Sequence, residues 1–182
     1  MKKSLITFCI LLFASSSFAQ EAGQDFCTGT EEGSYFPLDI QKKNIVWSGT
    51  RYTETKTNTK SIAGKQYTEY TQTWANGDQD KLYLREQNGV IYQGIPATGT
   101  EFVRYNPSFK KGHTWSGGVN FATFKIKSTR GTLVTPYCKY TNLLVIVGTY
   151  ADGQSFKFYY QRGFGYVGAT NKKGLVSYAS PV

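Results

Sequence analysis

Residues 143–161, LLVIVGTYADGQSFKFYYQ, carry the pattern that decides the fold. Leu143–Val147 is continuously apolar, which is typical of a strand that is buried on both faces. Asp152-Gly153 suits a tight turn with positive φ angles. Ser155–Gln161 then places aromatic rings at every second position, so these rings share one face of a second strand. The stretch predicts an antiparallel β-hairpin.

The same signals recur at short spacing along the chain. Asn76-Gly77 and Asn88-Gly89 are further turn pairs between strand-like runs. Phe124 and Ile126 alternate with lysines, as in a strand with one face in water. Strands are predicted at Arg51–Thr57, Lys65–Trp74, Lys81–Glu86, Val90–Gln93, Glu101–Tyr105, Ala122–Thr129, Leu143–Thr149, Ser155–Gln161, Gly165–Ala169 and Leu175–Tyr178.

Helix has little support in this chain. No segment shows a long apolar period of 3.6 residues. Asp78–Asn88 is the one candidate, but Leu82 and Leu84 within it alternate as they would in a strand. We therefore predict an all-β fold: a single antiparallel meander, closed or half-closed into a barrel, with little helix.

The first nineteen residues have the pattern of a cleaved export signal. Two lysines precede an apolar run, Leu5–Ala14, and the small residues Ser17 and Ala19 follow it at the cleavage positions. We expect residues 1–19 to be removed and residues 20–182 to form a single β-rich domain, periplasmic or secreted. No second apolar stretch is long enough to predict a transmembrane span.

Loss of this leader removes two of the 21 basic residues and leaves 19 against 12 acidic ones, a net charge of +7. An excess of this size suits nucleic acid, anionic lipid or an acidic protein. The longest basic runs are only pairs, at Lys42-Lys43, Lys110-Lys111 and Lys172-Lys173. We expect these pairs to be dispersed, and no motif supports nucleic-acid binding.

Two cysteines remain after the leader, Cys27 and Cys138. In an oxidising exported setting, such a pair favours one disulfide, which would close a loop of about 110 residues. The loop-closure entropy corresponds to roughly 4 to 5 kcal/mol of stabilisation. A redox function is disfavoured, because catalytic dithiols are usually spaced as C-x-x-C.

Catalytic residues are scarce. His113 is the only histidine and lies in a turn without a nucleophile motif, so an ordinary catalytic triad is not indicated. Asn76, Asp78 and Asp80 have the alternation of a calcium loop, but Lys81 stands where such loops have glycine. We expect no enzyme activity, no cofactor and no metal site.

Aromatic residues are the remaining functional signal. The chain has fourteen tyrosines, twelve phenylalanines and three tryptophans. Tyrosine-rich sheets hold apolar or sugar-like ligands and also protein segments, although tyrosine is equally a good strand residue. The candidate ligand-binding residues are Tyr67, Tyr70, Trp74, Tyr83, Tyr92, Tyr159 and Tyr160.

Three motifs resemble a pattern in small exported bacterial β-rich proteins, most of which have no assigned function. They are Tyr35–Leu38 (YFPL), Lys111–Trp115 (KGHTW) and Phe158–Val167 (FYYQRGFGYV). The resemblance implies one antiparallel β-domain, often barrel-like, without a known catalytic set. The pattern usually has an acid where His113 stands, and it transfers no functional residues.

These observations favour a non-catalytic exported binding protein that uses an aromatic-rich sheet face or cavity for a small apolar or sugar-like ligand. The alternative is a periplasmic immunity or inhibitor protein, whose partner would be an exported toxin or hydrolase. A basic surface would steer its association with an acidic protein partner.

Overall fold

The computed structural model describes residues 26–30, 32–118 and 121–181, and these residues form strands and no helix. The strands are β1 (Lys42–Trp47), β2 (Thr50–Ile62), β3 (Lys65–Trp74), β4 (Gln79–Gln87), β5 (Val90–Ile95), β6 (Thr100–Tyr105), β7 (Thr114–Ser116), β8 (Thr123–Val134), β9 (Lys139–Thr149), β10 (Ser155–Gln161), β11 (Gly165–Asn171) and β12 (Gly174–Ser180).

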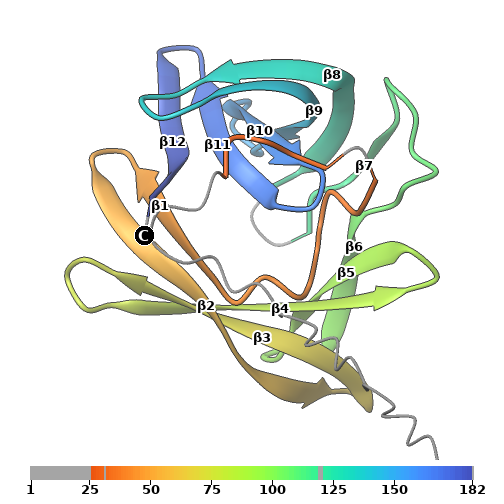
Figure 1. Ribbon diagram of the computed structural model, residues 1–182. Helices are drawn as coiled ribbons and strands as arrows, with labels where there is room; N and C mark the ends of the chain where they lie inside the picture. Colours follow the sequence, from red (N-terminus) through yellow and green to blue (C-terminus); the bar gives the residue numbers. More distant parts are fainter. Residues whose placement is uncertain (1–25, 31, 119–120, 182) are drawn as a thin grey trace, which may run out of the picture.

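All twelve strands belong to one antiparallel sheet in the order β6-β5-β4-β3-β2-β1-β12-β11-β10-β9-β8-β7. Two meanders, β1 to β6 and β7 to β12, are joined where β1 pairs with β12. Figure 1 shows β2 to β5 along one side of the molecule and β8 to β11 along the other. The sheet is nearly closed into a barrel, as the sequence predicts.

The barrel has its seam between β6 and β7, the two ends of the sheet. There the indole nitrogen of Trp115 on β7 donates a hydrogen bond of 3.0 Å to the carbonyl oxygen of Val103 on β6. One side chain thus bridges two strands that no ladder joins.

The predicted strand pattern is confirmed at all ten places, although several strands extend beyond the predicted limits. The segment Asp78–Asn88, the one helix candidate, contains β4 instead. The predicted turns also hold, since Gly77, Asn88, Gly89 and Gly153 all have positive φ. Strands β1 and β7 were not predicted.

The hairpin of β9 and β10 separates two groups of buried side chains. Leu144 and Ile146 belong to the core inside the barrel, whereas Leu143 and Val145 pack in a second core on the opposite face. The four side chains are at most 3% exposed. The apolar run is therefore buried on both faces, as predicted.

A disulfide between Cys27 and Cys138 fixes the N-terminal segment to the start of β9, which confirms the predicted pairing. The two residues are 111 positions apart, and their Cα atoms are separated by 5.2 Å. The predicted leader, residues 1–19, lies outside the described residues. No helix in the described part of the chain has the length and apolar character needed to cross a membrane.

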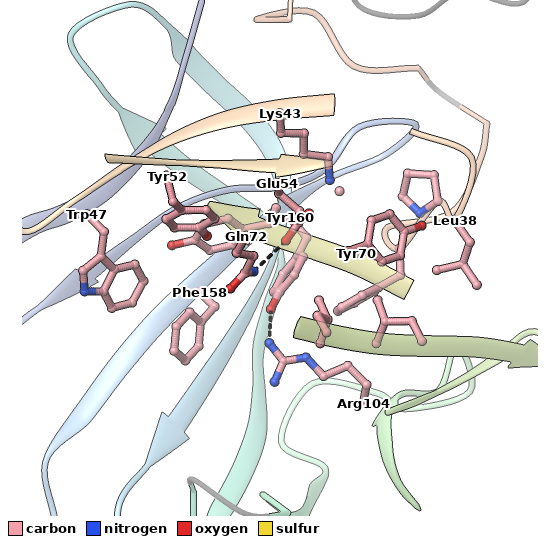
Figure 2. A pocket seen from close by; sticks show the side chains of 16 residues that line it. Leu38, Lys43, Trp47, Tyr52, Glu54, Tyr70, Gln72, Arg104, Phe158 and Tyr160 are labelled. Atoms are coloured by element: carbon pink, nitrogen blue, oxygen red, sulfur yellow. Dashed lines mark hydrogen bonds between the residues drawn. The ribbon is translucent and has the colours of Figure 1, made fainter. Parts of the chain in front are cut away.

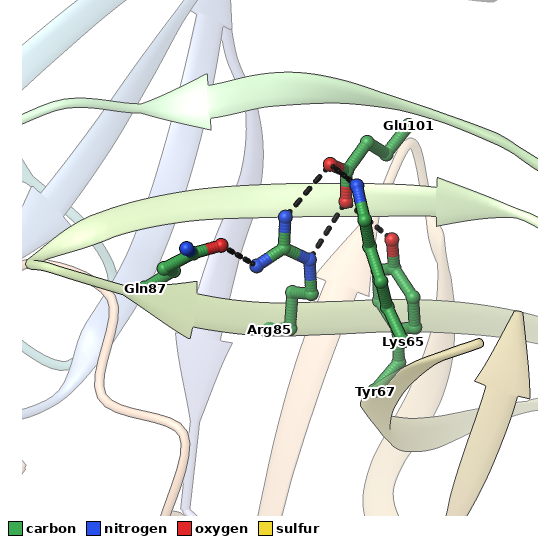
Figure 3. Close-up of polar contacts among 5 residues, drawn as sticks. All are labelled: Lys65, Tyr67, Arg85, Gln87 and Glu101. Carbon is green, nitrogen blue, oxygen red and sulfur yellow. Dashed lines mark hydrogen bonds and ion pairs between the residues drawn. The ribbon is translucent and has the colours of Figure 1, made fainter. Parts of the chain in front are cut away.

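An ionic network stabilises the outer face of β3, β4 and β6 (Figure 3). The Glu101 carboxylate accepts hydrogen bonds from the Arg85 guanidinium at 2.7 Å, from the Lys65 amine at 2.5 Å and from the Tyr67 hydroxyl. The bonds from Arg85, followed by those from Lys65 and Tyr67, hold the pKa of Glu101 at about 2, well below its usual value of 4.5.

We expect Glu101→Gln to lower the free energy of unfolding at neutral pH by about 1 to 2 kcal/mol, since the network is partly screened by solvent. Because the folded pKa lies below the unfolded one, the stabilisation is complete above pH 4.5 and is lost as the pH falls toward 2. Urea unfolding of the variant and the original protein should therefore converge across this range. A constant difference between them would contradict the prediction.

Candidate functional site

A cavity of about 160 Å³ lies inside the barrel. Its walls come from both meanders and from the segment that precedes β1, as Figure 2 shows. Residues of many different strands thus converge on one space. The lining residues are Phe36, Pro37, Leu38, Lys43, Trp47, Tyr52, Glu54, Tyr70, Gln72, Leu82, Leu84, Arg104, Phe158, Tyr160, Gly165 and Tyr166.

The segment before β1 supplies one wall of this cavity. Phe36 is buried, and its ring stacks on Tyr105 of β6 at 5.1 Å and on Tyr160 of β10 at 4.4 Å between ring centroids. In Figure 1 the segment runs between the two sides of the sheet. Phe36 therefore links the two sides from within.

Two polar pairs lie in the cavity walls (Figure 2). The Gln72 amide donates a hydrogen bond of 2.7 Å to the Glu54 carboxylate. Arg104 donates one of 3.2 Å to the Tyr160 hydroxyl, and its guanidinium group lies over the Phe124 ring at 5.2 Å. Neither cation of the cavity, Arg104 or Lys43, forms a salt bridge with Glu54 in the described structure.

The tyrosine hydroxyls of the cavity remain protonated at physiological pH. Burial raises the pKa of Tyr52, Tyr70, Tyr160 and Tyr166 above the usual value of 10. Among them, the hydroxyls of Tyr70 and Tyr166 are buried and have no hydrogen-bond partner among the described residues. A buried hydroxyl without a partner is costly, and the donor and acceptor of the Tyr70 hydroxyl are unused in the described structure.

Lys43 extends from β1 into the cavity (Figure 2). Desolvation lowers the pKa of its amine from 10.5, while the carboxylates of Glu54 and Asp39 oppose that shift. The side chain is only 8% exposed, although its neighbour Lys42 faces solvent. Lys43 therefore contributes little to the surface charge of the molecule, and the dispersal of the three lysine pairs stays a prediction.

The sequence-predicted binding residues fall into two groups. Tyr70 and Tyr160 line the cavity. The others lie elsewhere. Tyr67 and Tyr92 contact Arg85 on the outer face of the barrel, and Tyr83 lies on the same face. Trp74 packs on Tyr52 and donates a hydrogen bond to Asp80, whereas Tyr159 packs in the second core with its hydroxyl near Thr170.

The charged members of the site were not predicted. Lys43 was counted as a surface residue, and Glu54 and Arg104 were not singled out. One signal was available: Tyr52 and Glu54 alternate on β2 as Tyr70 and Gln72 do on β3, which gives each strand one face with an aromatic and a polar residue.

The residues weighed for catalysis and metal binding lie away from the cavity. His113 is exposed, and its ring stacks on Phe109 at 3.8 Å between centroids. The side chains of Asn76 and Asp78 bond to each other in the turn between β3 and β4. No cluster of three metal-ligating side chains occurs in the described residues.

Comparison with known proteins adds no relative. No protein-family model, no curated protein and no solved structure matches this chain. A functional assignment therefore has to come from the cavity itself.

Proposed function

We propose that this chain is a non-catalytic binding protein of the periplasm or the cell exterior, and that its barrel cavity receives one small ligand. The observation that carries this proposal is an aromatic-lined space with two unpartnered buried hydroxyls, those of Tyr70 and Tyr166. Ligand sites typically combine apolar and aromatic walls with a few polar groups that fix orientation.

The size of the cavity limits the ligand to about one ring. An apolar cavity of about 150 Å³ in another protein binds benzene, and the volume here is about 160 Å³. Phe158, Trp47 and Tyr160 offer ring faces and edges for such a compound. A single aromatic ring or one sugar ring fits these dimensions, whereas a fused polycyclic ligand would extend beyond this volume.

We expect benzyl alcohol or a monosaccharide to bind with micromolar to millimolar affinity and to shift backbone amide signals of β3, β4 and β10 in NMR titrations. Leu82→Trp should abolish this binding, because Leu82 lines the cavity and the larger ring would fill it. The matched control is Tyr83→Phe, since Tyr83 is the next residue on the opposite face.

Tyr83→Phe should leave the affinity unchanged if the barrel interior is the site. Equal loss of binding in both variants would instead favour the outer aromatic face. If none of the single-ring compounds binds, the proposed function is wrong.

A further inference from the structure

The amine of Lys43 is a charged group of the cavity whose position the proposed function does not explain. Lys43 forms no hydrogen bond and no ion pair with any residue that the structure describes, and its side chain is only 8% exposed, although its Nζ atom is not completely buried. Charged groups are normally buried only with a partner, because their desolvation is costly. The inward position of Lys43 therefore calls for an explanation.

The amine of Lys43 lies close to Phe164 and Gly165. Lys43 Nζ lies 5.3 Å from the centroid of the Phe164 ring, within range of a cation–π contact. A Cβ atom added at Gly165 would lie 2.9 Å from the same nitrogen. The φ of Gly165 is 87°, which favours glycine at this position.

Tyr70 supplies a second donor to the cavity. Lys43 and Tyr70 both line this cavity, Lys43 from β1 and Tyr70 from β3. The Tyr70 hydroxyl has no partner among the described residues. An ammonium group and a hydroxyl that both lack an acceptor are the complement of an anion.

The charges of the residues that line the cavity also favour an anionic ligand. Lys43 and Arg104 are cationic, and Glu54 is the one acid among the residues that line the cavity. Glu54 already accepts a hydrogen bond from Gln72, and Asp39 is exposed. The lining therefore carries one net positive charge, which one negative charge on a ligand would neutralise.

We infer that the ligand is a single-ring monocarboxylate, whose carboxylate accepts hydrogen bonds from the Lys43 ammonium and the Tyr70 hydroxyl while its ring packs among the aromatic side chains. This inference rests on the proposed function and specifies its ligand class. It distinguishes this cavity from a neutral sugar site, in which the ligand would carry no charge to pair with the Lys43 ammonium group.

Benzoate and benzamide are suitable probes, because they match in shape and differ in charge. Isothermal titration calorimetry should show that benzoate binds about ten- to a hundredfold more tightly than benzamide. This ratio corresponds to the free energy expected for hydrogen bonds to a charged group. Lys43→Met should remove this preference and retain binding of benzamide. Tyr70→Phe should reduce the preference in part.

The matched control is Lys42→Met, which removes a charge from the same strand at an exposed position. It should keep the preference for benzoate. A second measurement needs no variant: benzoate, but not benzamide, should shift the side-chain NMR signals of Lys43.

Two negative outcomes are distinguishable. Equal binding of benzoate and benzamide by the original protein, with no response of the Lys43 signals, overturns the inference and leaves a cavity for neutral rings. Failure of benzoate, benzamide and the neutral single-ring compounds alike overturns the proposed function together with the inference.

Discussion

Replacing both Cys27 and Cys138 by serine is expected to lower the free energy of unfolding by about 4 kcal/mol and the Tm by about 10 °C. The disulfide joins residues 111 positions apart, and a crosslink that closes a long loop removes much entropy from the unfolded chain. Urea unfolding of the oxidised protein and of the double variant measures this difference directly.

The dependence on denaturant gives an independent check on the mechanism. Because the crosslink acts mainly on the unfolded ensemble, the double variant should expose more surface on unfolding and show a steeper dependence on urea. Reduction of the original protein with dithiothreitol should reproduce both changes. A reduced protein that unfolds at the same urea concentration as the oxidised one would contradict this account.

The sequence predicts the β-strands well because each pattern is local. Leu143–Val147 and the Asp152-Gly153 turn specify a hairpin without reference to the rest of the chain, and the structure has it. Strand β1 was missed because it begins with two lysines, one of which points inward. Strand β7 has only three residues, too few to show a period.

The site is harder to predict because it depends on which face of each strand closes inward. Alternation shows that Tyr70 and Tyr67 lie on opposite faces of one strand, but not which face becomes the barrel interior. Tyr70 lines the cavity, whereas Tyr67 bonds to Glu101 on the outside. Closure of the barrel also encloses charged side chains such as Lys43, although a lysine in a sequence normally indicates an exposed position.

The segment before β1 also shows how tertiary contacts decide the site. Tyr35–Leu38 has no strand pattern, yet Phe36 joins the aromatic wall by stacking on rings of two distant strands. Nothing local in the sequence indicates those partners. Only the assembled barrel reveals that Phe36 helps to set the size of the cavity.

Phe36→Ala should therefore have two effects, on stability and on ligand size. We expect the free energy of unfolding to fall by about 3 to 5 kcal/mol, the usual cost of truncating a buried phenylalanine. The space left beside Tyr160 should enlarge the cavity, so that two-ring compounds such as 2-naphthol bind to the variant and not to the original protein. Urea unfolding and NMR titration measure the two effects.

A suitable control is Phe109→Ala, because Phe109 packs beside His113 in the loop before β7 and does not line the cavity. It is only partly buried, so its truncation should cost less and should leave the size preference for ligands unchanged. If Phe36→Ala destabilises the protein but still excludes two-ring compounds, the aromatic wall collapses into the space. Phe36 would then contribute to stability alone, and the limit on ligand size would have to come from the other side chains that line the cavity.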